Sequence, residues 1–261
     1  MKAQLLLEMG TVDSVVRVAA IADLHVGRTP MSAVSALFDQ INAHADVLAI
    51  CGDVTDHGLP EEATQLVREM AHALRVPAIA VLGNHDHEAG RAADVRSILR
   101  DGGLQVLDGD AHEVGGIGFA GVKGFCGGFG ARALGSWGEP LIKQFVQEAV
   151  SEALKLEAAL AHLRGMRIAL LHYAPVTSTI EGEPLEIYPF LGSSRLEEPL
   201  VRYAVAAAFH GHAHRGQPEG HTSSGIPVFN VSWPLLQKIR PDRPFHVLEL
   251  RPALGSAAQA P

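Results

Sequence analysis

Residues 77–86 read Pro-Ala-Ile-Ala-Val-Leu-Gly-Asn-His-Asp. The apolar part, Pro77–Leu82, has the length and the β-branched content of a buried strand. The polar part, Gly83-Asn84-His85-Asp86, combines turn-forming residues with side chains that bind cations and transfer protons. In open α/β sheets, ligands bind at the carboxyl ends of the strands. This stretch therefore predicts an α/β fold with a functional site at one edge of a sheet.

The same order of an apolar run, a polar cluster and a helical pattern recurs along the chain. Strands are expected at Val15–Ile21, Asp46–Ile50, Pro77–Leu82, Arg167–Leu171, Ala204–Phe209, Ile226–Val231 and Phe245–Leu250. Helices are expected after the N-cap and first-turn pair Thr29-Pro30, after Leu59, across Arg91–Arg100 and across Glu139–Arg164. Strands with helices between them indicate an α/β architecture, and the closely spaced late strands indicate that part of the sheet is antiparallel. Because no break in composition divides the chain, residues 1–251 are expected to form a single domain.

Three segments carry more specific expectations. Gly115-Gly116, between alternating apolar and polar residues, predicts a β-hairpin turn. The Gly-rich segment 121–130 contains Lys123 but lacks the pattern of a P-loop, so we expect a surface loop there. The apolar face of the helix expected over Glu139–Arg164 is predicted to hold Leu141, Ile142, Phe145, Val146, Ala149, Val150 and Leu154.

The composition excludes several classes of protein. The chain has 261 residues, with 21 basic and 29 acidic side chains, so its net charge is −8. An acidic chain is a poor nucleic-acid binder, because affinity for the phosphate backbone comes from Lys and Arg. The apolar runs are too short for a membrane span or a signal-peptide core, and the two Cys suit a reducing compartment, with Cys51 expected to be buried. We therefore expect a cytoplasmic protein with no membrane and no nucleic-acid partner, and a mobile tail at 252–261.

Polar clusters come directly after five of the expected strands. They are Asp23-Leu24-His25, Gly52-Asp53, Gly83-Asn84-His85-Asp86, His172 and Gly211-His212-Ala213-His214. The glycines before Asp53, Asn84 and His212 would let the backbone bend sharply at these points. Imidazole, carboxylate and amide groups together suit a pair of borderline cations. A chance collection of turn residues would explain one such cluster but not five in order.

This series of motifs resembles the calcineurin-like metallophosphoesterase superfamily, whose pattern is D-x-H, G-D, G-N-H-[DE], H and G-H-x-H in that order. The resemblance implies a four-layer α/β/β/α sandwich with two mixed sheets. It also implies two divalent or mixed-valence transition-metal ions (Mn, Fe or Zn). One ion would be held by Asp23, His25, Asp53 and His214, and the other by Asp53, Asn84, His172 and His212. By the same resemblance His85 would face the phosphate and the leaving group without binding metal, and Asp86 would orient His85 from behind.

The charges of such a centre favour a phosphoester substrate. Two divalent ions give +4, and Asp23 and Asp53 give −2, so the site stays positive even after one hydroxide forms. The expected activity is hydrolysis of a small-molecule phosphodiester or phosphomonoester by in-line attack of a metal-bridging hydroxide, without a covalent intermediate. Two alternatives stay open: a DNA exonuclease of the same superfamily, and a non-catalytic scaffold that keeps the fold.

Several residues near the motifs remain open. Arg28 and His57 are candidate substrate contacts, although each is also the residue type expected on a solvated loop. The protein-phosphatase branch of the superfamily tends to have Arg at the position of His57, which argues against that branch here. Tyr173 directly follows His172, and strand alternation predicts that its side chain points away from the metals. His210 is expected to be hydrogen-bonded within the wall of the site.

Overall fold

The apolar runs form the strands of two mixed sheets in a computed structural model, which describes residues 15–252. The first sheet has the order β11 (His246–Leu250), β1 (Val16–Ile21), β2 (Val47–Cys51), β3 (Ala78–Val81) and β4 (Gln105–Leu107). The second has the order β5 (Asp110–Val114), β6 (Ile117–Gly121), β7 (Arg167–Leu170), β8 (Ala207–His210), β10 (Pro227–Asn230) and β9 (Glu219–His221). Among the strands of residues 15–252, only β11, β5 and β9 pair antiparallel to their neighbours, which confirms the expected mixed character.

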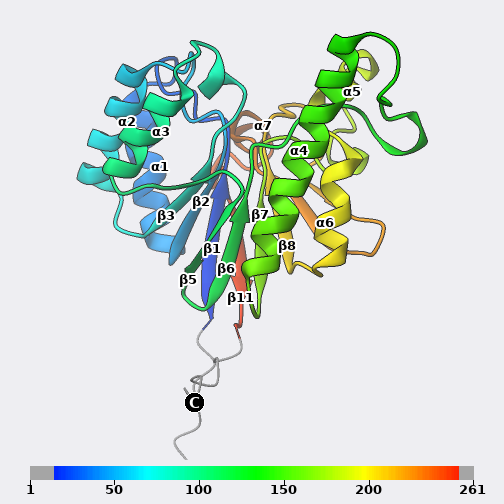
Figure 1. The fold of residues 1–261 in the computed structure, drawn as a ribbon. Coiled ribbons are helices and arrows are strands. Elements are labelled where there is room, and N and C mark those ends of the chain that lie inside the picture. The colour runs from blue at the N-terminus through cyan, green and yellow to red at the C-terminus, as the bar shows by residue number, and fades with distance from the viewer. Residues whose placement is uncertain (1–14, 253–261) are drawn as a thin grey trace, which may run out of the picture.

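Helices cover the outer face of each sheet. The first sheet packs against α1 (Met31–His44), α2 (Pro60–Ala73) and α3 (Ala92–Asp101), and the second against α4 (Pro140–His162) and α6 (Glu197–Arg202). The inner faces pack on each other through side chains such as Ala49 of β2 and Phe119 of β6. The fold is the four-layer α/β/β/α sandwich that the family resemblance implied, and Figure 1 shows its layers side by side.

Shorter elements connect these layers. The short α5 (Tyr188–Leu191) and α7 (Trp233–Ile239) precede α6 and β11, and 3₁₀ turns lie at His85–His87, Gly130–Arg132, Thr177–Thr179, Leu185–Ile187 and Ser194–Leu196. The strand β9 and the helices α5, α6 and α7 were not predicted. The helix α1 begins one residue later than expected, with Pro30 at its N-cap. At the β5–β6 turn, Gly115 and Gly116 both have positive φ, as the expected hairpin requires.

The buried face of α4 differs from the expected one. Leu141 is 76% exposed and Leu154 is 57% exposed, whereas Glu152 is only 1% exposed. Glu152 can be buried because it accepts hydrogen bonds from the backbone N–H of Gly124 and from Lys155 Nζ, at 2.8 and 2.7 Å. These partners depend on the tertiary structure, so helical periodicity alone could not reveal them.

The segment 121–130 is not the surface loop that we expected. Val122 and Cys126 are buried, and the carbonyl of Lys123 accepts hydrogen bonds from the backbone N–H groups of His172 and Tyr173, at 3.0 and 3.1 Å. The segment therefore packs against the chain that follows β7.

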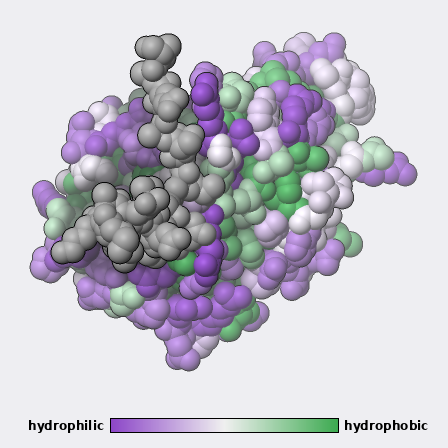
Figure 2. Space-filling model, turned by 90° about the horizontal axis from the view of Figure 1, so that it is seen from below, coloured by the Kyte–Doolittle hydropathy of each residue, from purple (hydrophilic) through white to green (hydrophobic). Residues whose placement is uncertain are grey.

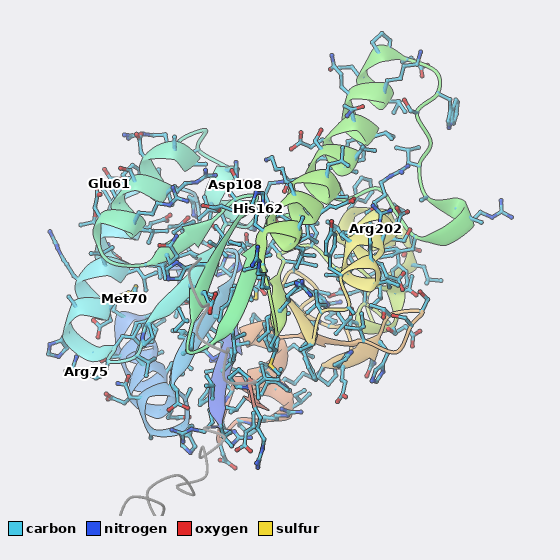
Figure 3. The ribbon with its side chains drawn as sticks, turned by 60° about the horizontal axis from the view of Figure 1, so that its bottom comes forward. Glu61, Met70, Arg75, Asp108, His162 and Arg202 are labelled. Atoms are coloured by element: carbon cyan, nitrogen blue, oxygen red, sulfur yellow. The ribbon has the colours of Figure 1, made fainter. Side chains whose placement is uncertain are left out.

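Ion pairs join the two outer layers along one side. Asp108 contacts Arg96 of α3 at 2.7 Å and Lys155 of α4 at 3.4 Å, and Figure 3 shows Asp108 between these helices.

The two ends of the molecule differ in character. In Figure 1 the parallel strands of the first sheet run upward, so their carboxyl ends lie at the top. The opposite face, seen in Figure 2, has apolar side chains between hydrophilic ones.

Within residues 15–252, no helix combines the length and apolarity that a membrane span needs. Apart from Pro252, the tail expected at 252–261 lies outside the described residues.

Candidate metal centre

Donor side chains from all five motif blocks meet where the two sheets end. Three groups each bring one donor atom per residue within 4.8 Å of one another: Asp23, His25 and His214; His25, Asp53 and His85; and Asp53, His172 and His212. The carboxylate of Asp53 lies between the first and the third of these groups. Its Oδ2 is 3.9 Å from His25 Nε2, and its Oδ1 is 3.4 Å from His172 Nε2. Asp53 is therefore placed to contact two cations at once.

The backbone around this cluster is held in an uncommon conformation. Among residues 15–252, five residues other than Gly have positive φ, and four of them are Asp23, His25, Asp53 and His212. Positive φ costs an L-residue free energy, although Asp and His adopt it more readily than most. Such strain persists where the surrounding structure fixes it, and it clusters at functional sites. The four residues turn sharply here so that their side chains converge.

The glycines before the donors make room for this convergence. Gly52 has φ +84°, which confirms the expected bend, and a Cβ there would lie 2.4 Å from His172 Nδ1. Gly83 and Gly211 do not have positive φ, so their role is close approach rather than the bend that we expected. A Cβ on Gly83 would lie 2.1 Å from Asp53 Oδ1, and one on Gly211 would lie 2.7 Å from Asp23 Oδ2. Each glycine thus leaves space for a donor side chain.

The hydrogen bonds of His172, which is buried, and of His212, which is half-buried, leave one ring nitrogen of each available to a cation. His172 Nδ1 is 3.0 Å from the carbonyl of Cys51, which can only accept a hydrogen bond, so Nδ1 carries the proton. In the neutral ring Nε2 then presents a lone pair, yet it faces Asn84 Oδ1 at 2.8 Å. In this orientation of the Asn84 amide two acceptors face each other, and a cation bound by both would satisfy them. Protonation of the ring is disfavoured, because burial lowers the pKa of His172. His212 is arranged similarly: its Nε2 lies 3.2 Å from the carbonyl of Phe190, which leaves Nδ1 as the lone pair.

The pKa values of the clustered side chains reflect two carboxyl groups that lie close together in a buried site, where a cation would stabilise their charged forms. Burial first and the charge of Asp23 second raise the pKa of Asp53 to about 7. Burial would likewise raise the pKa of Asp23, but the hydrogen bond and the charge of His214 outweigh it and lower that pKa. Burial also lowers the pKa of His25 to about 4 and that of His212 to about 3. Burial would also lower the pKa of His214, but the hydrogen bond and the charge of Asp23 outweigh it and raise that pKa, so metal binding there would release the proton that this ring holds.

Neither ring nitrogen of His25 makes a hydrogen bond of good geometry: Nδ1 lies 3.0 Å from Asp56 Oδ1, and Nε2 has its nearest acidic oxygen, Asp53 Oδ2, at 3.9 Å. A buried polar atom without a partner is costly, and a cation held by Nε2 would remove that cost. The donor set therefore fits two metal ions divided as the resemblance implies. The assignment of each ligand stays a prediction.

His85 stands at the open side of the cluster. Its side chain is 35% exposed, and its ring packs edge-on against that of His25 with 4.6 Å between centroids. Its Nδ1 donates to the carbonyl of Asp56 at 2.7 Å, and its backbone N–H donates to Asp53 Oδ1 at 2.9 Å. The ring is thus oriented by Asp56, with Nε2 left available.

The expectation that Asp86 orients His85 from behind is wrong. Asp86 is fully buried and accepts four hydrogen bonds, from Thr55 N at 2.8 Å, Thr55 Oγ1 at 2.6 Å, Gly83 N at 2.7 Å and Val54 N at 3.2 Å. These donors belong to the segments that follow β2 and β3. Asp86 therefore ties together the two turns that carry Asp53 and Asn84, which is a structural role at the site.

Asp56 is a site residue that the motifs did not single out. Its Oδ1 lies 3.0 Å from His25 Nδ1 and 3.6 Å from Arg28 Nε, and its Oδ2 lies 3.1 Å from His57 Nδ1. Arg28 and His57 are each 60% exposed. The structure thus brings both candidate substrate contacts to the rim of the site. The one signal for Asp56 in the sequence is that it follows Asp53 by three residues.

His210 and Tyr173 lie close to candidate ligands in the sequence, and the structure places them differently. His210 is buried and bonded to Thr179 Oγ1 at 2.7 Å and to the carbonyl of Gly211 at 2.8 Å, so it belongs to the wall as expected. The ring of Tyr173 lies 4.7 Å from that of His212 between centroids. The expectation that Tyr173 points away is wrong, because β7 ends at Leu170 and strand alternation does not extend to residue 173.

Fold and site together define an α/β/β/α protein with a site suited to two metals. A family model described as calcineurin-like phosphoesterase matches residues 16–216, and the chain belongs to that family. No curated protein sequence matches the chain significantly.

Several solved structures are similar to it. The phosphopantetheinyl hydrolase PptH from Mycobacterium tuberculosis has 16% identity and a TM-score of 0.62, over 94% of this chain and 98% of that one. The protein TT1561 from Thermus thermophilus has 15% identity and a TM-score of 0.52, over 90% and 99%. The purple acid phosphatase PPD1 from yellow lupin seeds has 17% identity and a TM-score of 0.52, over 77% of this chain and 38% of that one. At these identities the likeness supports the fold.

Proposed function

We propose that this protein is a metal-dependent hydrolase that cleaves a small-molecule phosphomonoester or phosphodiester. The observation that carries the proposal is the position of the Asp53 carboxylate between two donor groups, with Asp23, His25 and His214 on one side and His172 and His212 on the other. Two cations bound there would polarise the phosphoryl group and lower the pKa of a water molecule, so that hydroxide is available near neutral pH. We propose Mn, Fe or Zn for these ions, because the donors mix imidazole with oxygen.

The chain's own residues account for the remaining requirements. Hydrolysis forms a bond from a water oxygen to phosphorus, breaks the bond from phosphorus to the ester oxygen, and delivers a proton to the departing alkoxide. His85 is suited to deliver this proton, because Asp56 holds Nδ1 while the ring is exposed at the open side of the site. Arg28 and His57 lie at the rim, where they can meet phosphate oxygens or the rest of the substrate.

The net charge and the named relatives bear on the substrate class. The charge of −8 favours a small molecule over DNA, so the exonuclease alternative ranks lower. The Mycobacterium tuberculosis neighbour is named for hydrolysis of a phosphopantetheinyl group and the lupin neighbour for acid phosphatase activity. Both names are compatible with a phosphoester substrate here.

The test combines metal loading with a substrate panel. Purified protein is loaded with Mn²⁺, Fe²⁺ or Zn²⁺ and assayed on p-nitrophenyl phosphate, bis(p-nitrophenyl) phosphate and a DNA duplex. We expect hydrolysis of at least one of the small esters, loss of activity with a chelator, and no activity in Asp53→Ala. Hydrolysis of the duplex alone would favour the exonuclease, and inactivity on every ester with metal bound would favour the scaffold.

A further inference from the structure

An apolar groove lies between α4 and α5, outside the metal centre. Its volume is about 380 Å³, within the range of small-molecule sites, and its apolar walls include Ile142 and Phe145 of α4 together with Pro189 and Phe190 of α5. Phe190 is 58% exposed. Figure 1 shows α5 beside the upper end of α4, the end toward which the strands of the site run.

The groove is connected to the metal centre along the backbone. The carbonyl of Phe190 contacts His212 Nε2 at 3.2 Å, and the carbonyl of Pro189 accepts a hydrogen bond from the N–H of Gly127 at 2.8 Å. The residue that forms one wall of the groove therefore also holds a candidate metal ligand in place.

A line of aromatic rings makes a second connection. Centroids are separated by 4.7 Å from His212 to Tyr173, 6.0 Å from Tyr173 to Phe125 and 5.0 Å from Phe125 to Phe145, which is a wall residue of the groove. Lys123 Nζ lies 4.9 Å from the centroid of Phe125 and 5.4 Å from that of Tyr173, so a cation–π contact steadies the middle of the line. Packed rings thus link the donor cluster to the wall of the groove through the hydrophobic core.

We propose that this groove binds the apolar arm of the substrate's alcohol, so that the enzyme prefers phosphoesters of apolar alcohols. The inference rests on the proposed function and names the substrate class for the same site. With the phosphoryl group at the metals, an alkyl or aromatic chain can extend past Phe190, which borders both His212 and the groove. Burial of that chain removes exposed apolar surface from water on both partners.

The first test is a chain-length series. The metal-loaded protein is assayed on ethyl, butyl, hexyl and octyl phosphate and on the matching p-nitrophenyl alkyl diesters. Full burial of one methylene is worth roughly fourfold. Because the groove is open on one side, we expect kcat/KM to rise about twofold for each added methylene.

Variants locate the effect. In Ile142→Ser and Phe190→Ser, the slope of log(kcat/KM) against chain length is expected to fall by at least about half. Leu154→Ser is the matched control: Leu154 is also exposed on α4, but lies nine residues from Phe145 and so about half a turn round the helix. A slope that survives in both groove variants, or falls equally in the control, overturns the inference.

A binding readout separates this inference from the proposed function. Titration calorimetry with ethyl- and octylphosphonate measures affinity without turnover, and the octyl compound is expected to bind at least tenfold more tightly to the wild type. Hydrolysis of the short esters with a flat chain-length series would sink the inference and leave the proposed function standing. Absence of hydrolysis with every ester would sink the proposed function instead. Concentration-dependent dimerisation that Ile142→Ser and Phe190→Ser abolish, with a flat series, would assign the groove to a second copy of the chain.

Discussion

Asp86→Asn is expected to lower the free energy of unfolding by about 3 kcal/mol. The carboxylate accepts four hydrogen bonds, two on each oxygen, inside a fully buried site. An amide keeps one oxygen, so its NH₂ group must face two donors. Each buried donor left without a partner costs roughly 1–3 kcal/mol, and relief of the buried negative charge offsets part of that sum. The remaining cost is a large share of the 5–15 kcal/mol typical of a folded protein.

Thermal and urea unfolding of metal-free protein measure this loss. For a chain of this size, about 3 kcal/mol corresponds to a fall in Tm of roughly 6–12 °C. Asp94→Asn is the matched control, because its ion pair with Arg91 is 2.8 Å long but more than half exposed, and such pairs contribute under about 1 kcal/mol. If Asp86→Asn is no less stable than Asp94→Asn and only turnover falls, Asp86 acts on His85 after all and the structural assignment is refuted.

Three further predictions concern single positions. In Gly83→Ala, the new Cβ would lie 2.1 Å from Asp53 Oδ1, so metal analysis should show loss of at least one ion, and full occupancy would contradict the tight packing. His85→Ala should keep its metals and turn over about 10²–10⁴-fold more slowly; equal loss of metal and activity would make His85 a ligand. The ring of His246 packs 4.1 Å from that of Phe229, and burial lowers its pKa to about 4. Between pH 6.5 and 4 the unfolded chain therefore binds a proton at His246 that the folded chain does not, so stability falls as the pH drops through that range. Between pH 7 and 5, the free energy of unfolding measured in urea should therefore fall by about 1–2 kcal/mol less in His246→Phe than in the wild type. Identical pH profiles of the two proteins would contradict the burial of a neutral ring.

The candidate ligands could be located from the sequence because they lie within a few residues of strand ends, and the family resemblance then implied which of them bind metal. Parallel strands end at a common edge, so Asp23 and Asp53 converge once β1 and β2 are placed side by side. His172 follows β7 of the other sheet, and its approach to them depends on how the two sheets pack. Glycines that make room for donors were also visible in the sequence. Only the structure, however, distinguishes the positive φ of Gly52 from the close approach at Gly83.

What the sequence missed depends on contacts between distant segments. Asp86 looked like a partner of its neighbour His85, but its hydrogen-bond donors include Thr55, 31 residues away. Glu152 interrupts an apolar helix face and is buried because Gly124 donates to it. The groove between α4 and α5 leaves no local pattern, since its walls come from separate helices.

The most direct test of the central claim is metal content measured together with phosphoester hydrolysis on the same sample. The account predicts two bound ions per chain in active wild-type protein, and in Asp53→Ala the loss of at least one ion together with all hydrolysis. Full hydrolytic activity in protein stripped of metal, or two ions still bound in Asp53→Ala, would contradict it.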